Sequence, residues 1–218
     1  TVNNLVSGTI AVQSQEDHYT FTLAVPTRVY FDSLTSSNAY AWSLTGPRGE
    51  VVANRSLASS DAAGFNGASI LDLVAGNYTL AVKKTASDVA GYAFRLIDAS
   101  TATVVTPGTA VSGQLSPASS TSLYGFTAST GDRFSFDQRS VTGPAPTWRL
   151  VDPFGGTVWG PTTFADVPTV TLEKTGTYTL LVEGAPGATG TTDYSFAVVS
   201  QGTGPVSFPS LTLGTPVS

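Results

Sequence analysis

The sequence predicts an all-β chain made of two tandem antiparallel β-sandwich domains of jelly-roll-like type. Apolar and polar residues alternate with a period of two in many short segments, and no segment keeps a helical period. A set of motifs also occurs twice in the same order, about 105 residues apart. With 218 residues, the chain is long enough for two domains of ordinary size.

The strands of the first domain follow from its alternating segments. Tyr19, Phe21 and Leu23 share one face of a strand, and Thr20 and Thr22 share the other. The same pattern predicts further strands at residues 28–32, 42–44, 78–82 and 92–96, with a turn at residues 46–49 (GPRG).

The second domain repeats these elements in order, at residues 124–126, 133–137, 148–150, 152–155, 176–182 and 194–196. Residues 214–218 (GTPVS) echo residues 108–112 (GTAVS), so the pattern starts a third time. We therefore predict a first domain at residues 1–100, a second at 101–204, and a linker or the start of a third repeat at 205–218. Since the chain also contains no Met, we expect a processed product or a piece of a longer array.

Two pairs of aromatic residues occupy equivalent positions in the repeats. Tyr78 and Tyr178 each follow a glycine at the start of a strand, so we predict that each ring enters the core while its hydroxyl reaches nearby backbone. Trp42 and Trp148 share strand parity with apolar neighbours, which indicates core packing.

The order of these motifs resembles the bacterial pre-peptidase C-terminal domain family. In that family a D-x-Y-x-F strand, a D/G-P-x-G turn and a G-x-Y-x-L-x-V strand follow one another, as they do at residues 17–21, 46–49 and 76–82. The resemblance implies a β-sandwich attached to secreted proteases or repeated in surface proteins, usually without catalytic activity. Some relatives bind calcium and a polymer. The second domain lacks the acidic residue of the first motif, because Ser122 stands in its place.

Composition limits the function classes. The net charge is −5 and only 11% of residues are charged, which argues against nucleic-acid binding, because such proteins need clustered Lys and Arg. Cysteine is absent, which excludes disulfides, thiolate metal sites and Cys nucleophiles. No apolar run is long enough to insert into a membrane.

Catalysis is not predicted. His18 is the only imidazole, it lies on the outward parity of its strand, and no G-x-S-x-G motif accompanies it. We interpret it as a surface residue. A glycosidase needs two carboxylates on opposite sides of a cleft. The Asp and Glu residues of this chain are scattered, and repeated sandwiches of this size rarely contain such a cleft.

Asp17, Asp32 and Asp137 are the candidate metal ligands, because carboxylates are hard oxygen donors suited to calcium. No acidic cluster surrounds Asp32 or Asp137, so we favour the alternative that each opens a turn through bonds to its own backbone. No cofactor is therefore predicted, with calcium left as the alternative.

Three aromatic residues distinguish the second domain from the first. If Val158 matches Val52, then Trp159 faces outward, next to Phe154 at a turn and Phe164 in a shortened loop. These residues could form a patch that stacks on sugar rings or anchors a protein. The favoured alternative is that Trp159 is covered by its own loop or by the neighbouring domain.

The function predicted from these observations is non-catalytic. The chain is expected to be a monomeric extracellular repeat module, a spacer or stalk of a large bacterial surface or secreted protein of adhesin type, with neighbouring repeats of the same chain as partners. The alternative is an accessory module of a secreted protease or other hydrolase that binds a carbohydrate or a matrix protein. Calcium could assist this binding.

Overall fold

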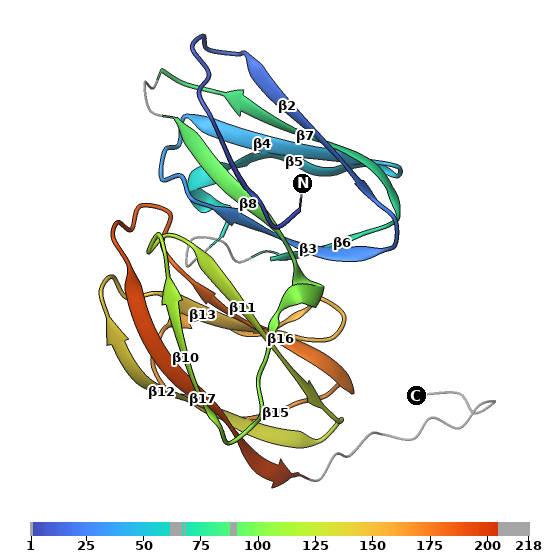
Figure 1. The fold of residues 1–218 in the computed structure, drawn as a ribbon. Helices are drawn as coiled ribbons and strands as arrows, with labels where there is room; N and C mark the ends of the chain where they lie inside the picture. The colour runs from blue at the N-terminus through green and yellow to red at the C-terminus, as the bar shows by residue number, and fades with distance from the viewer. Residues whose placement is uncertain (1, 62–66, 68, 88–90, 205–218) are drawn as a thin grey trace, which may run out of the picture.

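The computed structural model describes residues 2–61, 67, 69–87 and 91–204. Two β-sandwiches follow one another along the chain (Figure 1). The predicted linker at 205–218 lies outside the described residues. No helix in the described ranges has the length and hydropathy needed to cross a membrane.

The first unit contains eight described strands and the short 3-10 helix η1 (Leu57–Ser59). The strands are β1 (Leu5–Gly8), β2 (Glu16–Leu23), β3 (Thr27–Ser33), β4 (Tyr40–Gly46), β5 (Gly49–Ser56), β6 (Ile70–Leu73), β7 (Gly76–Lys84) and β8 (Tyr92–Asp98). They form two antiparallel sheets with the orders β1-β8-β3-β6 and β2-β7-β4-β5.

The second unit follows the 3-10 helix η3 (Ala99–Thr101) and repeats the first strand for strand. Its strands are β9 (Thr103–Val104), β10 (Ala110–Leu115), β11 (Thr121–Ala128), β12 (Asp132–Thr142), β13 (Thr147–Val151), β14 (Thr157–Thr163), β15 (Val167–Thr171), β16 (Gly176–Glu183) and β17 (Thr192–Thr203). The sheet orders are β10-β17-β12-β15 and β14-β13-β16-β11-β9. Apart from β9, each strand has its counterpart at the same place in the first unit, so the predicted all-β fold of two sandwiches is confirmed.

Each sandwich is filled by the inward residues of its alternating strands. Trp42 and Trp148 are both fully buried, as predicted. The Trp42 ring stacks on Phe31 at 3.8 Å between ring centroids, and Trp148 packs against Phe136 from the facing sheet. An aromatic core of this kind buries a large apolar area in each unit, which holds the two sheets together.

The two tyrosines act as predicted. The Tyr78 hydroxyl donates to the carbonyl of Val74 at 2.8 Å, and the Tyr178 hydroxyl donates to the carbonyl of Lys174 at 2.7 Å. Both rings are buried. Each hydroxyl thus closes the turn that leads into its own strand, which satisfies a backbone group that the turn would otherwise leave without a partner.

The segment that joins the units is itself part of the second sandwich. Its strand β9 pairs in parallel with β11, and the Val105 N–H donates to the carbonyl of Gly125 at 2.8 Å. Further on, the Gly108 N–H donates to the carbonyl of Val198 at 2.7 Å. The segment is therefore bonded to both sheets of the second unit.

Candidate functional site

The two units meet through the outer faces of two sheets. Strands β3 and β6 of the first unit lie against β11, β13 and β16 of the second, a contact that we call the junction (Figure 1). A separate apolar cluster fills it, made of Tyr30, Ile70, Ala99, Leu123, Val151 and Leu181. The outer faces of these strands are therefore covered by the other unit, whereas antiparallel sheets commonly expose one face to solvent.

A buried carboxylate bonds across this junction. Glu183 has no solvent exposure, and it accepts a hydrogen bond from the Tyr30 hydroxyl of the first unit at 2.8 Å. The Arg149 Nε donates to the other carboxylate oxygen at 2.6 Å, and Arg149 is equally buried. Burial raises the pKa of Tyr30, as does the charge of Glu183, so the phenol stays protonated and donates.

A second carboxylate group lies at the same junction. Asp32 Oδ2 accepts from the Arg95 Nε at 2.7 Å, and Arg95 also donates to the Thr121 carbonyl of the second unit. Asp61 Oδ2 accepts from the Ser33 N–H at 2.7 Å. Within the described residues, the Oδ1 atoms of Asp32 and Asp61 have no donor.

The two aspartates interact with one another and titrate abnormally. Burial raises the pKa of Asp32 to about 6, although Arg95 opposes the shift. Burial, followed by the charges of Asp32 and Glu183, raises the pKa of Asp61 well above its usual value. Hydrogen bonding between the two carboxyl groups raises the pKa of Asp61 and lowers that of Asp32, so Asp61 is the member of the pair that keeps a proton. The proton on Asp61 therefore gives a donor to this buried pair, whose Oδ1 atoms have no other described donor.

The sequence interpretation of Asp32 was wrong. Asp32 does not open a turn: it lies within β3, on the face that the second unit covers, and it is fully buried. Period-two alternation separates the two faces of a strand but does not show that another unit covers the outer face.

The other two metal candidates do not form a cluster. The Asp17 carboxylate accepts from the Tyr92 hydroxyl at 2.5 Å, and that hydroxyl also bonds to Tyr19. Asp137 is half-buried with Ser135 Oγ at 3.4 Å, and it lies in the middle of β12, so the interpretation that it opens a turn was wrong as well. Among the described residues, no group of three or more His, Asp or Glu side chains is placed to hold a metal ion.

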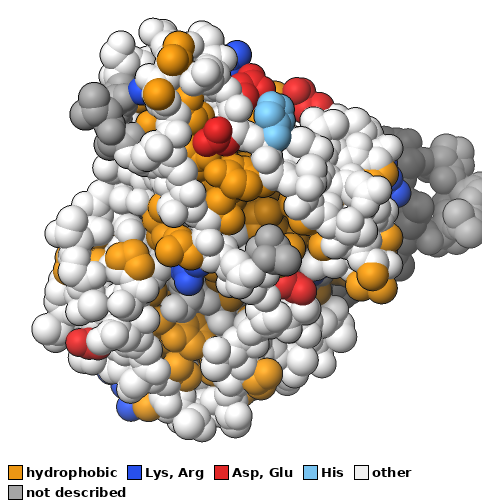
Figure 2. Space-filling view, turned by 45° about the horizontal axis from the view of Figure 1, so that its top comes forward, with side chains coloured by type: hydrophobic (Ala, Val, Ile, Leu, Met, Phe, Trp, Pro, Cys, Tyr) orange, Lys and Arg blue, Asp and Glu red, His pale blue; other side chains and the backbone are white. Residues whose placement is uncertain are grey.

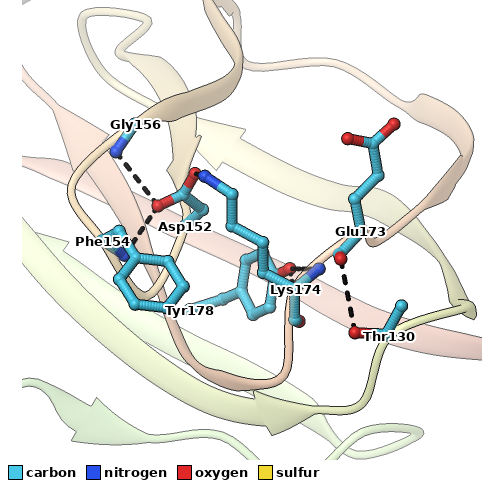
Figure 3. A network of polar contacts seen from close by, with 7 residues as sticks. All are labelled: Thr130, Asp152, Phe154, Gly156, Glu173, Lys174 and Tyr178. Carbon is cyan, nitrogen blue, oxygen red and sulfur yellow. Dashed lines mark hydrogen bonds and ion pairs between the residues drawn. The ribbon is translucent and has the colours of Figure 1, made fainter. Parts of the chain in front are cut away.

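A turn in the second unit holds Phe154, the exposed member of the predicted aromatic patch. Asp152 Oδ1 accepts from the N–H groups of Phe154 and Gly156, and Oδ2 accepts from the Lys174 Nζ (Figure 3). The Lys174 Nζ also lies 5.3 Å from the centroid of the Phe154 ring. Burial opposes the ionisation of Asp152, but the Lys174 ammonium and the two N–H groups outweigh it and lower its pKa. The turn thus presents a ring that is 66% exposed on a fixed backbone.

The rest of the predicted patch is not formed. Phe164 is buried against Trp148, with 4.7 Å between ring centroids. Trp159 points inward and packs on Phe136 and Trp148. The prediction that Trp159 faces outward was wrong, because its ring is partly buried and packs on the core of its own unit; neither a loop nor the neighbouring unit is needed to cover it.

One extra turn residue explains the error. In the first unit Leu44 pairs with Val52, whereas in the second unit the equivalent Leu150 pairs with Trp159. The turn of the second unit is one residue longer, because Gly156 is added. A shift of one residue exchanges the two faces of a strand, so Trp159, and not Val158, takes the place of Val52.

The junction residues other than Asp32 were missed by the sequence analysis. A signal for them exists in β13 and β16, whose apolar runs are almost continuous: Trp148, Leu150 and Val151 in one, and residues 180–182 in the other. Such runs are typical of strands that are covered on both faces. His18, in contrast, is exposed as predicted, with Glu16 as its neighbour at 3.3 Å.

A cleft of about 740 Å³ opens beside the junction, between the β2–β3 turn and the linker. Val25 and Val104 are on its lining and are 64% and 83% exposed. Pro26 and several threonines add to the lining, together with two charged residues, Arg28 and Asp98. The mixture of exposed apolar and hydroxyl groups suits a peptide segment better than a strongly charged ligand.

Comparisons with known proteins place the chain in no family. No family model and no curated protein matches it by sequence. Among solved structures, it is similar to PliG, a periplasmic inhibitor of g-type lysozyme from Aeromonas hydrophila, with 15% identity, a TM-score of 0.40, and coverage of 46% of this chain and 96% of that one. It is also similar to the CUB1-EGF-CUB2 domains of human MASP-1/3, with 10% identity, a TM-score of 0.28, and coverage of 91% and 100%. For rat MASP-1 the values are 9%, 0.27, 89% and 97%.

We predict that Trp159→Ala lowers the free energy of unfolding by about 3 kcal/mol, because it removes a large ring that packs in the core. Phe154→Ala is the matched control, and its effect should stay within about 0.5 kcal/mol, because that ring is exposed. Urea denaturation measures both. Equal effects of the two variants would contradict this placement of Trp159.

The junction should lose stability as the pH rises. The folded pKa of Asp32 is raised above its unfolded value, so its contribution is fully present below about pH 4 and is lost as the pH rises through about 6. Asp61→Asn replaces the carboxyl group that interacts with Asp32 by an amide that donates at every pH, while its carbonyl can still accept from Ser33. Thermal unfolding from pH 4 to 8 should show a weaker pH dependence in this variant. Asp72→Asn, at an exposed ion pair, should keep the wild-type dependence.

Proposed function

We propose that the chain is a non-catalytic, rigid two-unit structural module that acts as a spacer or stalk of a large secreted or surface protein of bacteria, of adhesin type. The observation that carries the proposal is the buried junction. An apolar cluster, a bonded carboxylate and a linker that is part of the second sandwich all restrict the angle between the units. Membership in the pre-peptidase C-terminal domain family is part of this proposal.

The placement of the polar groups supports a non-catalytic role. The buried pair of Asp32 and Asp61 has the chemistry of an acid–base pair, but both residues are almost without solvent exposure, so no substrate can reach them. Glu183 is closed off in the same way. His18 is exposed, and the described contact of its ring is with Glu16. A structural role at the junction accounts for the burial of Asp32, Asp61 and Glu183.

The cleft beside the junction favours a second function. An accessory module that binds a matrix protein would use the exposed valines of the cleft, Val25 and Val104. Both units contribute residues to the cleft lining, so the cleft exists only while the units keep their relative position. A carbohydrate is supported less well, because Phe126, the aromatic residue in the lining, is itself buried. Binding that is assisted by calcium stays a proposal. Among the described residues, no cluster of side chains is placed to hold the ion.

The structural function predicts a specific effect of a junction variant. Leu181→Asp places a charge in the apolar cluster, so we expect a lower melting temperature, two separate unfolding transitions and a larger radius of gyration in X-ray scattering. The matched control is Ala81→Asp, at the equivalent position on the uncovered sheet of the first unit, which should resemble wild type. Unchanged scattering and melting of Leu181→Asp would contradict the rigid-module proposal.

The second function predicts a ligand that depends on the cleft. Arrays of glycans and of matrix proteins, probed with and without calcium, should yield a protein that binds wild type and loses at least tenfold in affinity for Val104→Asp. Phe154→Ala, away from the cleft lining, is the control and should bind normally. A hit that is insensitive to Val104→Asp would exclude the cleft as its site.

A further inference from the structure

The outer face of the β2-β7-β4-β5 sheet in the first unit carries a groove of about 600 Å³. All four strands contribute to its lining, and so does Ser14, which precedes β2. Figure 2 shows the histidine of this face at the surface, next to acidic side chains. The groove shares no lining residue with the cleft beside the junction, so it is a separate site.

The pairing register of the strands explains why this face is hollow. Ala81 on β7 lies between His18 on β2 and Ser43 on β4. Larger side chains occupy the equivalent row of the second unit, namely Leu123, Leu181 and Arg149. Since paired residues of neighbouring strands lie about 5 Å apart on one face, a short side chain in the middle of a row leaves a slot between its neighbours. The hollow thus follows from the residues of this row.

Charged groups lie at one end of the groove. The Glu16 carboxylate has one oxygen 3.3 Å from the His18 Nε2 and the other 3.5 Å from the Lys83 Nζ. All three side chains are partly exposed and belong to the lining. The charges of Glu16 and Lys83 cancel, so this end offers strong hydrogen-bond donors and acceptors without a net charge. Such a site favours neither an anion nor a cation.

A β-bulge brings an amide to another side of the groove. Two residues of β5, Ala53 and Asn54, lie opposite the single residue Ser43 of β4. Asn54 has a φ of 45°, which Asn tolerates better than most residues, and its N–H donates to the Ser43 Oγ at 2.9 Å. The second unit has the same bulge with Gly160 and Pro161. The first unit therefore has a side-chain amide where the second has none.

Hydroxyl groups make up most of the remaining lining, which includes Ser14, Ser43, Thr45, Thr79 and Thr85. A hydroxyl both donates and accepts, so it can pair with the hydroxyls of a sugar in either sense. Among the described residues of the lining, Ala81 alone is apolar, so the groove lacks the apolar centre of a protein interface. It also lies on the face of the sheet, whereas an added peptide strand needs an edge. The lining therefore favours an uncharged ligand rich in hydroxyls.

We propose that this groove binds a neutral oligosaccharide. One sugar ring lies over Ala81, between His18 and Ser43. Glu16 accepts from its hydroxyls and Lys83 donates to them. The described lining contains no Phe, Tyr or Trp for stacking, so the affinity rests on hydrogen bonds, whose net gain is modest, and binding is expected at millimolar concentrations. The site goes beyond both proposed functions, because neither the junction nor the cleft takes part in it.

An NMR titration of the isotope-labelled full chain with cellotetraose, maltotetraose and mannotetraose tests the proposal. At least one of them should shift the amide resonances of Ser43 and Ala81. Ala81→Leu should weaken this binding at least tenfold, because the longer side chain fills the slot. The fold accepts leucine there, since Leu181 holds the equivalent position. Ala110→Leu, the same change at an exposed position of β10, is the matched control and should bind like wild type.

Thr79→Val gives a second readout, because it removes one hydroxyl and keeps the shape of the side chain. It should weaken binding about fivefold, the usual share of one hydrogen bond, and it carries the test if Ala81→Leu fails to fold. Three results would overturn the proposal: no shift at Ser43 and Ala81 with any of the three sugars, shifts that both variants leave unchanged, or tighter binding of tetragalacturonate, an anionic sugar. Shifts that Val104→Asp abolishes would place the sugar in the cleft, which would overturn it as well.

Discussion

Glu183 is a carboxylate without access to water, and the relative position of the two units depends on how it is satisfied. A buried charge is costly unless opposite charge and hydrogen bonds surround it. Arg149 supplies the charge from the neighbouring strand, and Tyr30 supplies a hydroxyl from the other unit. Because a hydrogen bond depends on distance and direction, the apolar surfaces around this bond can slide very little. The apolar cluster holds the units together, and Glu183 sets their register.

The chemistry of the junction is specific to this pair of faces. Positions that carry Leu123, Leu181 and Glu183 in the second unit carry His18, Ala81 and Lys83 in the first, at the same pairing register of the equivalent strands. The sheet of the first unit that contains these residues therefore has the fold of a junction face but not its apolar and acidic groups. Stacking of further units through this face would lack the contacts that make the observed junction, so repetition of the fold does not imply repetition of the interface.

Much of the fold could be predicted from period-two alternation and from the duplication of motifs, because both depend on contacts within one sheet or one unit. Trp42, Trp148 and the two turn tyrosines were found in this way. Asp32 and Trp159 were not, and for different reasons. The environment of Asp32 is set by the other unit, about which local alternation carries no information. The direction of Trp159 depends on one added turn residue, Gly156, and an error of one residue is enough to reverse a side chain. The buried pair of Asp61 and Asp32 was not predictable, since Asp61 lies outside any repeated motif.

The linker shows why short connections between sandwiches need not be flexible. A free segment rich in Thr, Pro and Gly would let the units swing, and its length would then set only the spacing. Here the segment pairs with β11, buries Val105 and bonds to the opposite sheet through Gly108, so its ends are fixed to the body that it leads into. η3 fixes the other end, because Asp98 accepts from the Ser100 N–H and Ala99 is part of the junction cluster. Bending within this pair would require β9 to separate from β11 and the buried Tyr30–Glu183 bond to break together, and each of these contacts makes the other harder to lose.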